Sequence, residues 1–450
     1  MNSFERRSVF SLAGIYGLRM LGLFMILPVF SLYAEGLHGV TPMLVGLALG
    51  IYGLTMALFQ IPFGMLSDRF GRKPIITVGL LLFAIGSIIA AMSDSIWGVI
   101  LGRAIQGSGA IAAAMMALMA DLTREEERTK SMAIMGVSIG MSFTLALMIG
   151  PLLNAGIGVA GIFWMTAILA SVGIAMLYLF VPDPEHLNFH REVETVPAQL
   201  KHILFDRQLF RLDIGILIQH AIMMAMFTVL PFVLRDKLGL PTDEHAWFYL
   251  PVLMISVLGM APLVMFAEKK QKMKQVFLGC ITLMAVSELL LGTDQRSLFA
   301  IGIGLLLFFV AFNVLEACLP SLISRMAPVE SKGTAMGVYS TSQFLGAFVG
   351  GAGGGWLSGA FGIQAVFYAC AITALVWVLI ALGMHVPAYL SSFMAQVQVA
   401  NENDAEQLAE QMLQLDGVHE AKVILEDGVA YLKVDKKQFD QKQLKALLTV

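Results

Sequence analysis

The chain has 450 residues, of which 58% are hydrophobic and only 14% are charged, and its formal net charge is −3. Soluble globular proteins carry about 25% charged residues, so the composition excludes that class and indicates a membrane protein with many spans. The three cysteines lie in apolar stretches without a C-x-x-C pair or a histidine cluster, so neither a metal site nor another cofactor is expected.

Twelve apolar stretches, each long enough to cross a bilayer as a helix, fill most of the first 385 residues. The expected fold is an all-α polytopic membrane protein with six plus six transmembrane helices, followed by a small α+β domain. The first stretch is far longer than the apolar part of a signal peptide, so we expect it to be a retained helix. The expected spans are 9–34, 43–66, 75–93, 97–120, 131–153, 157–181, 209–234, 246–267, 275–292, 298–324, 334–358 and 363–385.

The distribution of basic residues predicts the orientation of these spans. If the N-terminus lies inside, the inner connections carry 18 Lys and Arg residues, and the outer connections carry only Arg235, Lys237 and Arg296. The positive-inside rule then places both termini in the cytoplasm. We expect a multi-pass protein of a bacterial inner membrane.

Arg19 lies in the middle of the first span, where even a lenient scale puts the cost of inserting an arginine at ~2.5 kcal/mol or more. It therefore needs a partner or a water-filled cavity. Two interpretations remain open. Arg19 either anchors a substrate or a carboxylate, or it is a structural arginine bonded to carbonyls of a broken helix.

A short charged turn joins the second and third spans. Four ionisable residues fall within ten positions between long apolar stretches, namely Asp68, Arg69, Arg72 and Lys73. They must lie in water or at an interface, and Gly64 and Gly71 suit a close backbone approach or a sharp turn. The spacing G-x-x-x-D-R-x-G-R-K closely resembles the loop signature of the major facilitator superfamily, found there between transmembrane helices two and three.

The resemblance implies a transporter in which Asp68 meets the start of the eleventh span near Gly333, and Arg72 pairs with Asp121 at the end of the fourth. An anion at a helix N-terminus is worth ~0.3–1 kcal/mol when exposed and up to ~2 kcal/mol when partly buried. Such a cluster forms only when the two halves meet on the inside, so it should favour an outward-open state that protonation of Asp68 releases. The alternative is that these charges are solvated and only set the topology.

The fourth span contains Arg103-Ala104-Ile105-Gln106-Gly107, which resembles the superfamily's fourth-helix motif, associated there with proton transfer. On the expected boundaries Arg103 lies within about two turns of the outer end, so snorkelling of its side chain to the interface is the alternative. In the fifth span, Gly136, Gly140, Gly150 and Pro151 resemble a partial form of the motif of drug antiporters, without the glycine pair that usually follows.

A polar connection at 182–208 divides the spans six and six. An internal repeat supports this division, because Pro62 and Asp68-Arg69 recur at an offset of 200 as Pro262 and Glu268-Lys269. Parallel repeats of this kind are typical of transporters built from two similar halves. We expect an N-terminal bundle at 1–181 and a C-terminal bundle at 209–386.

Glu316 lies inside the tenth span and is the only carboxylate that we expect well inside any span. A carboxyl desolvated there has the property required of a proton carrier, although a permanently ionised partner of an arginine is the alternative. We expect Arg19 and Glu316 to face a common central cavity, with direct contact left open. Gln106 and Asn313 are assigned to the same region, and His220 in the seventh span either relays protons or is simply hydrogen-bonded.

After residue 386 the chain becomes polar. Alternation and helical periodicity predict a strand, a helix, two strands around a Glu-Asp-Gly turn and a second helix, at 393–400, 404–415, 418–425, 428–434 and 438–448. This order fits a cytoplasmic ferredoxin-like module at 387–450. Its late lysines, Lys433, Lys436, Lys437, Lys442 and Lys445, either reach anionic lipid or are solvated.

These features predict a secondary active transporter rather than an enzyme, which exports a small amphipathic compound in exchange for protons by alternating access. No P-loop signature is present, so nothing suggests that ATP drives it. The expected partners are the substrate, protons, the lipid bilayer and a ligand or partner of the C-terminal module, with no nucleic acid. The alternative is a non-enzymatic membrane sensor, or a regulated transporter gated by the module.

Overall fold

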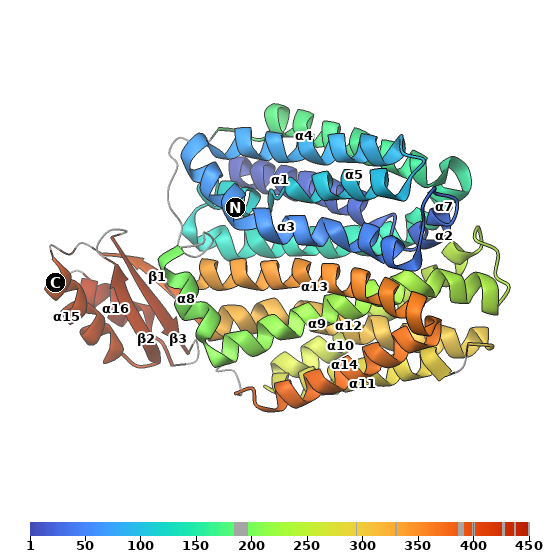
Figure 1. The fold of residues 1–450 in the computed structure, drawn as a ribbon. Helices are drawn as coiled ribbons and strands as arrows, with labels where there is room; N and C mark the ends of the chain where they lie inside the picture. The colour runs from blue at the N-terminus through green and yellow to red at the C-terminus, as the bar shows by residue number, and fades with distance from the viewer. Residues whose placement is uncertain are drawn as a thin grey trace.

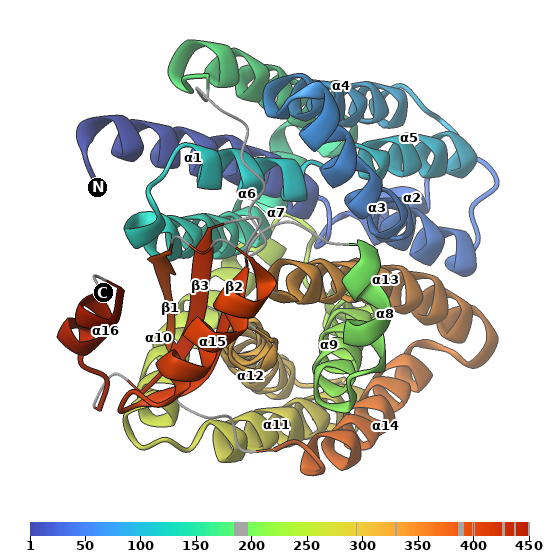
Figure 2. The same cartoon turned by 90° about the vertical axis from the view of Figure 1, so that its left-hand side faces the viewer.

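The computed structural model describes residues 1–183, 197–293, 295–328, 331–385, 391–397, 399, 401–424, 428–435 and 438–448. Two bundles of long helices lie side by side, and a small domain containing a β-sheet lies at one end of them (Figure 1 and, seen from that end, Figure 2). We call this end the module end and the opposite end the far end. The expected fold class, a helical membrane domain with a small α+β module, is confirmed.

The N-terminal bundle contains α1 (Ser3–Phe24), α2 (Phe30–Ala34), α3 (Pro42–Phe70), α4 (Arg72–Ala91), α5 (Ile96–Ser108), α6 (Ala112–Asp121) and α7 (Glu125–Phe180). The first and fourth expected spans are each broken into two helices. The fifth and sixth spans together form α7, which turns back at Gly158, where φ is 67° and ψ is 173°. A positive φ of this size favours glycine, which explains why the reversal occurs there.

The C-terminal bundle contains α9 (Arg207–Phe232), which continues as a short π-helix, η1 (Val233–Lys237), then α10 (His245–Lys269), α11 (Met273–Thr293), α12 (Leu298–Met326), α13 (Lys332–Phe361) and α14 (Ile363–Leu382). The helix α8 (Pro197–Phe205) lies within the connection expected at 182–208. Nine helical stretches of the described residues are long and apolar enough to cross a bilayer. Since α7 reverses direction, and α1 and α13 run alongside the others (Figure 1), the arrangement accommodates the twelve expected spans.

The far halves of the two bundles are in close contact through α3 and α13. A side chain on Gly46 would collide with the carbonyl oxygen of Gly351, and one on Gly50 would lie 2.8 Å from the carbonyl oxygen of Phe348. Such small residues allow two helix backbones to approach closely. Ser31 also donates a hydrogen bond to the carbonyl of Phe227 across the bundles, over 3.1 Å.

At the far end itself, an ion pair joins the bundles. Nη2 of Arg235, in η1, lies 3.1 Å from Oε1 of Glu35, which follows α2. Together with the glycine contacts, this pair joins the two bundles at the far end.

The C-terminal domain contains β1 (Ser391–Gln396), α15 (Glu402–Leu413), β2 (Val418–Ile424), β3 (Val429–Val434) and α16 (Gln441–Leu448). The strand order is β1-β3-β2 with antiparallel neighbours, and Ser391 and Val418 both pair with Val434. One sheet face packs on the helices through Met412, Leu432 and Leu444. The predicted β-α-β-β-α order is confirmed, although β1 ends before residue 400 and α16 begins later than expected.

Candidate functional site

Four polar side chains meet inside the C-terminal bundle, and we call them the central cluster. They are Gln219 and His220 on α9, Glu316 on α12 and Gln343 on α13. The Gln219 amide donates to Oε2 of Glu316 over 2.9 Å, and the Gln343 amide donates to Oε1 over 3.1 Å. Both carboxylate oxygens are therefore hydrogen-bonded, while 36% of the Glu316 side chain stays exposed.

His220 belongs to the same network. Its Nδ1 atom lies 3.3 Å from the carbonyl oxygen of Ile216, and its Nε2 atom lies 2.9 Å from the amide nitrogen of Gln343. Since a carbonyl only accepts and an amide NH₂ only donates, this bonding pattern assigns the proton to Nδ1 and makes Nε2 an acceptor. The ring is then neutral, and one amide nitrogen of Gln343 holds both His220 and Glu316.

Several buried polar atoms beside the central cluster have no hydrogen-bond partner among the described residues. They include Oε1 of Gln219, the hydroxyl of Tyr339 and Oδ1 of Asp213. Tyr339 lies one turn before Gln343 on α13, toward the module end. Asp213 precedes His220 by two turns of α9, about 10 Å toward the module end. These atoms extend the polar region from the cluster toward that end.

Glu316 is not the only buried carboxylate of the C-terminal bundle, although the other two lie within two turns of a helix end. Asp213 is buried in α9, and Glu288 is fully buried in α11 with both carboxyl oxygens unpartnered in the described part of the chain. The burial of Glu288 follows from close packing between the helices around it. For example, a side chain on Gly304 of α12 would lie 2.9 Å from Leu291 of α11.

Arg19 lies inside the N-terminal bundle, and the structure does not bring it to Glu316. Its Nη2 atom donates to the carbonyl of Gly109 over 2.8 Å, and its guanidinium carbon lies 5.2 Å from the centre of the Phe83 ring. Gly109 stands in the break between α5 and α6, so this contact matches the structural interpretation of Arg19. Its Nε and Nη1 atoms have no partner among the described residues.

Arg103 and Gln106 form a second network in the same bundle. The Arg103 guanidinium donates to Oε1 of Gln106 over 3.0 Å and to the carbonyls of Ala48 and Leu49 over 3.3 Å. Arg103 is buried, so its side chain does not snorkel to the interface as the alternative required. Its hydrogen bonds tie α5 to α3.

Asn313 lies one turn from Glu316 on α12, outside the central cluster. Its amide donates to the hydroxyl of Ser256 over 3.1 Å, which links α12 to α10. Asn313 therefore ties α12 to α10 and is not joined to the central cluster.

The charged turn between α3 and α4 contains the predicted pairing of Arg72 with Asp121. The Nε atom of Arg72 lies 3.1 Å from Oδ2 of Asp121, and Nη1 donates to the hydroxyl of Ser67 over 3.0 Å. Arg72 also pairs with Asp68. Gly71 joins the two helices with φ 94°, a conformation that favours glycine. The cluster thus holds the module ends of α3, α4 and α6 together.

The remaining residues of the turn have local contacts. Arg69 lies over the ring of Phe70, and a side chain on Gly64 would approach Ala113 to 3.2 Å, so Gly64 allows α3 to pack on α6. Lys73 donates to the carbonyl of Val181 over 2.7 Å.

Asp68 is not found at the start of α13, where the resemblance placed it. The hydroxyl of Thr334, in the first turn of α13, instead donates to the side-chain oxygen of Gln199 on α8 over 3.3 Å. The bundles touch through their far halves here, and the predicted inner contact is not formed in this arrangement.

The chain matches the family model of the Major Facilitator Superfamily over residues 12–351 and 271–393. The chain belongs to the major facilitator superfamily. It is 48% identical over 433 residues to the inner membrane transport protein YajR of Escherichia coli K12, with 96% of this chain and 95% of that protein covered.

Other members of the superfamily are more distant. The multidrug resistance protein MdtH of Proteus mirabilis is 26% identical over 303 residues, covering 65% of this chain and 72% of that protein. A bacterial homologue of the human lysosomal transporter Spinster, in an inward-facing and occupied conformation, has a TM-score of 0.69 at 13% identity. That match covers 85% of this chain and 97% of the other. The chain is therefore a multi-pass membrane transporter of the major facilitator superfamily.

Proposed function

We propose that this transporter exports a small amphipathic compound in exchange for protons across a bacterial inner membrane, with its module end in the cytoplasm. The charge asymmetry of the connections supports this orientation, since 18 basic residues lie in the connections assigned to the inside. The likeness to YajR supports the inner membrane, and the likeness to MdtH supports drug-like substrates. The central cluster is the observation that most directly supports exchange with protons.

The central cluster offers Glu316 hydrogen-bond partners both when it is ionised and when it is protonated. The ionised carboxylate accepts hydrogen bonds from the amides of Gln219 and Gln343. A protonated carboxyl becomes a donor and needs an acceptor, which the unpartnered Oε1 atom of Gln219 provides once its amide rotates. Since a buried donor without an acceptor costs ~1–3 kcal/mol, this exchange of partners keeps both states accessible.

In the proposed alternating access, the two ends of the molecule close in turn. The far halves are joined here through Gly46, Gly351 and the pair of Glu35 with Arg235. In the opposite state, we expect Asp68 to replace Gln199 at the first turn of α13, where the helix dipole favours an anion. Neutralising Asp68 then weakens that inner contact.

Transport into proteoliposomes under an imposed pH gradient, screened over a panel of compounds, tests this function. Glu316→Gln should abolish proton-driven transport and leave substrate binding largely intact. Glu288→Gln is the matched control, because it removes a buried carboxyl of the same bundle outside the central cluster. A Glu316→Gln protein that still moves protons in step with substrate removes Glu316 from the mechanism.

Gating by the C-terminal module is a second candidate role, supported by one contact. Nζ of Lys433, on β3, donates to the carbonyl of Ala327 over 2.7 Å and lies 3.0 Å from Oε2 of Glu420. Ala327 directly follows α12 in the connection to α13. Of the lysines expected to reach lipid, Lys433 contacts the bundle instead, while Lys436 and Lys437 lie outside the described residues.

The contact between Lys433 and Ala327 can be used to test whether the module gates transport. Lys433→Met removes the bond to the membrane domain, whereas Glu420→Gln removes only the partner inside the module. A gated transporter should change its rate in the first variant and keep it in the second. Equal rates in both variants and in the unaltered protein would refute gating through this contact.

A further inference from the structure

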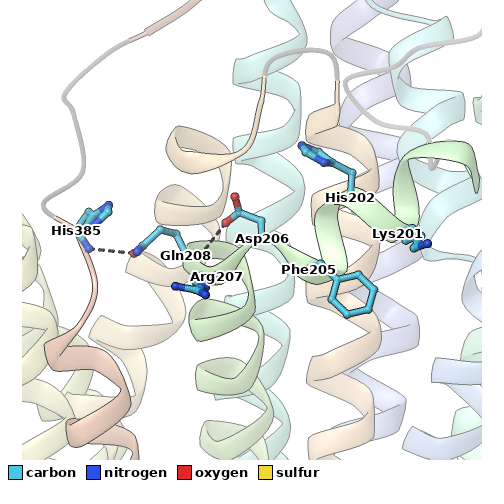
Figure 3. A pocket seen from close by; sticks show the side chains of 7 residues that line it. All are labelled: Lys201, His202, Phe205, Asp206, Arg207, Gln208 and His385. Atoms are coloured by element: carbon cyan, nitrogen blue, oxygen red, sulfur yellow. Dashed lines mark hydrogen bonds between the residues drawn. The ribbon is translucent and has the colours of Figure 1, made fainter.

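A surface pocket of about 770 Å³ lies at the module end, between α8, the first turn of α9 and the residues after α14 (Figure 3). It is outside the central cluster and outside the charged turn between α3 and α4. The lining residues are Lys201, His202, Phe205, Asp206, Arg207, Gln208 and His385.

Internal hydrogen bonds fix the wall of this pocket. Oδ1 of Asp206 accepts from the backbone nitrogens of Gln208 and Leu209, over 2.8 and 2.9 Å, and so caps α9. The side-chain oxygen of Gln208 accepts from the backbone nitrogen of His385 over 3.0 Å, as Figure 3 shows. The only carboxylate among the lining residues is thus already engaged with the backbone.

The cations of the pocket remain available to a ligand. Lys201 and Arg207 form no ion pair with any residue in the described part of the chain. With Asp206 as the only acid, the lining carries a net positive charge even when both histidines are neutral. An anion therefore complements it. Arginine and lysine are the residues that bind phosphate groups through charge-assisted hydrogen bonds.

The position of the pocket relative to the membrane narrows the choice of anion. The span formed by α9 begins at Arg207 and the span formed by α14 ends at Leu382, so the pocket lies where both helices leave the hydrocarbon. Phe205 of the lining is 77% exposed, and Phe210, about one turn after Arg207 on α9, is 52% exposed. Cations next to exposed aromatic residues at this level are typical of contact with lipid headgroups and acyl chains.

We propose that this pocket binds the phosphodiester headgroup of an anionic phospholipid, with the acyl chains lying along Phe205 and Phe210. A soluble phosphate shares the headgroup chemistry, but it gains nothing from the exposed aromatic rings. Bound lipid also holds α8 in place. Since Gln199 of α8 contacts Thr334 of α13, lipid at this pocket stabilises the arrangement of the helices seen here.

Native mass spectrometry of the full chain, titrated with phosphatidylglycerol or phosphatidylcholine, tests the proposal. Each basic residue near an anionic lipid surface is worth about fivefold in affinity, so Lys201→Gln with Arg207→Gln should weaken phosphatidylglycerol binding on the order of thirtyfold. The matched control is Lys269→Gln with Lys270→Gln, which removes the same charge at the end of α10. It should change the affinity far less.

Further variants separate lipid from soluble phosphate. Phe205→Gln should weaken phosphatidylglycerol binding, and excess inorganic phosphate should fail to displace the lipid. The exchange of Lys201→Arg with Arg207→Lys keeps the charge and should retain binding, which separates a lost site from a misfolded protein. Displacement by inorganic phosphate, equal binding of phosphatidylcholine, or an equal loss in the control would each overturn the proposal.

Discussion

Oε2 of Glu316 lies 3.9 Å from Nε2 of His220 inside the C-terminal bundle. The amide nitrogen of Gln343 lies between them and bonds to both residues. None of the described lysines or arginines pairs with this carboxylate, so its charge is balanced by neutral donors. A carboxyl in this environment can take up and release a proton without breaking an ion pair, as a proton carrier must.

Arg19→Gln should lower the rate of transport without moving the pH at which transport is half-maximal. The reason is that Arg19 bonds to Gly109 in its own bundle and does not contact Glu316. The pH profile of proton-driven transport in proteoliposomes provides the measurement. A profile that moves along the pH axis would show that Arg19 and Glu316 are coupled in another state of the cycle.

Asp213→Asn should slow proton-driven transport while leaving substrate counterflow unchanged. Asp213 and Tyr339 extend the polar region from the central cluster toward the module end, so they are placed to pass protons between Glu316 and the water there. Both rates are measured in the same proteoliposomes. The control is Asp243→Asn, an exposed aspartate in the connection after the same span. Equal rates in both variants would exclude Asp213 from the proton path.

Gly46→Ala should open the far end, because the new methyl group collides with the carbonyl of Gly351. Overpacking of this kind costs ~1–3 kcal/mol, which corresponds to roughly a 5- to 150-fold change in the ratio of the two states. The readout is labelling of Ser31→Cys by a maleimide that does not cross the membrane, since the native cysteines are all buried.

The control for this experiment is Gly353→Ala on the facing helix, where an added methyl group meets no atom within 4 Å. Labelling should stay at the level of the Ser31→Cys background in this variant. If both alanines raise labelling equally, the close glycine contact is not what holds the far end shut.

Asp121→Asn should lower the free energy of unfolding by about 3 kcal/mol, because it removes a partner of the buried guanidinium of Arg72. Titration of the purified protein with SDS measures this loss. Asp183→Asn should cost less than ~1 kcal/mol, since the aspartate that pairs with Lys73 is 85% exposed. A similar loss in both variants would mean that burial of the Arg72 pair adds nothing to stability.

The sequence predicts the membrane domain well, because long apolar stretches interrupted by short charged turns leave few alternatives. Asp68, Arg72 and Asp121 could be assigned for the same reason, since charges are rare in this chain and their spacing is distinctive. The break after α1 was missed, although Pro28 lies within it and lacks the amide hydrogen that a continuous helix needs.

The contacts between helices could not be predicted from one sequence. Gln343 is uncharged, and nothing in its local pattern marks it as the residue that joins His220 to Glu316. Asp213 is only one turn inside its span and resembles an interfacial residue until the packing around it is known. Asp68 pairs with Arg72 in its own bundle, and its spacing in the sequence does not distinguish this local partner from one on α13.

The close approach of α3 and α13 at Gly46 and Gly351 has an electrical consequence. Backbone packed on backbone leaves no room for a chain of water molecules at this contact. We therefore expect much of the membrane potential to fall across the layer of α3–α13 glycine contacts in this conformation. A potential of 100 mV is worth about 2.3 kcal/mol per elementary charge that crosses it. Glu316 lies on the module-end side of that layer, so in the proposed proton exchange voltage acts on the rearrangement that carries the proton past the glycines, and not on the binding of the proton.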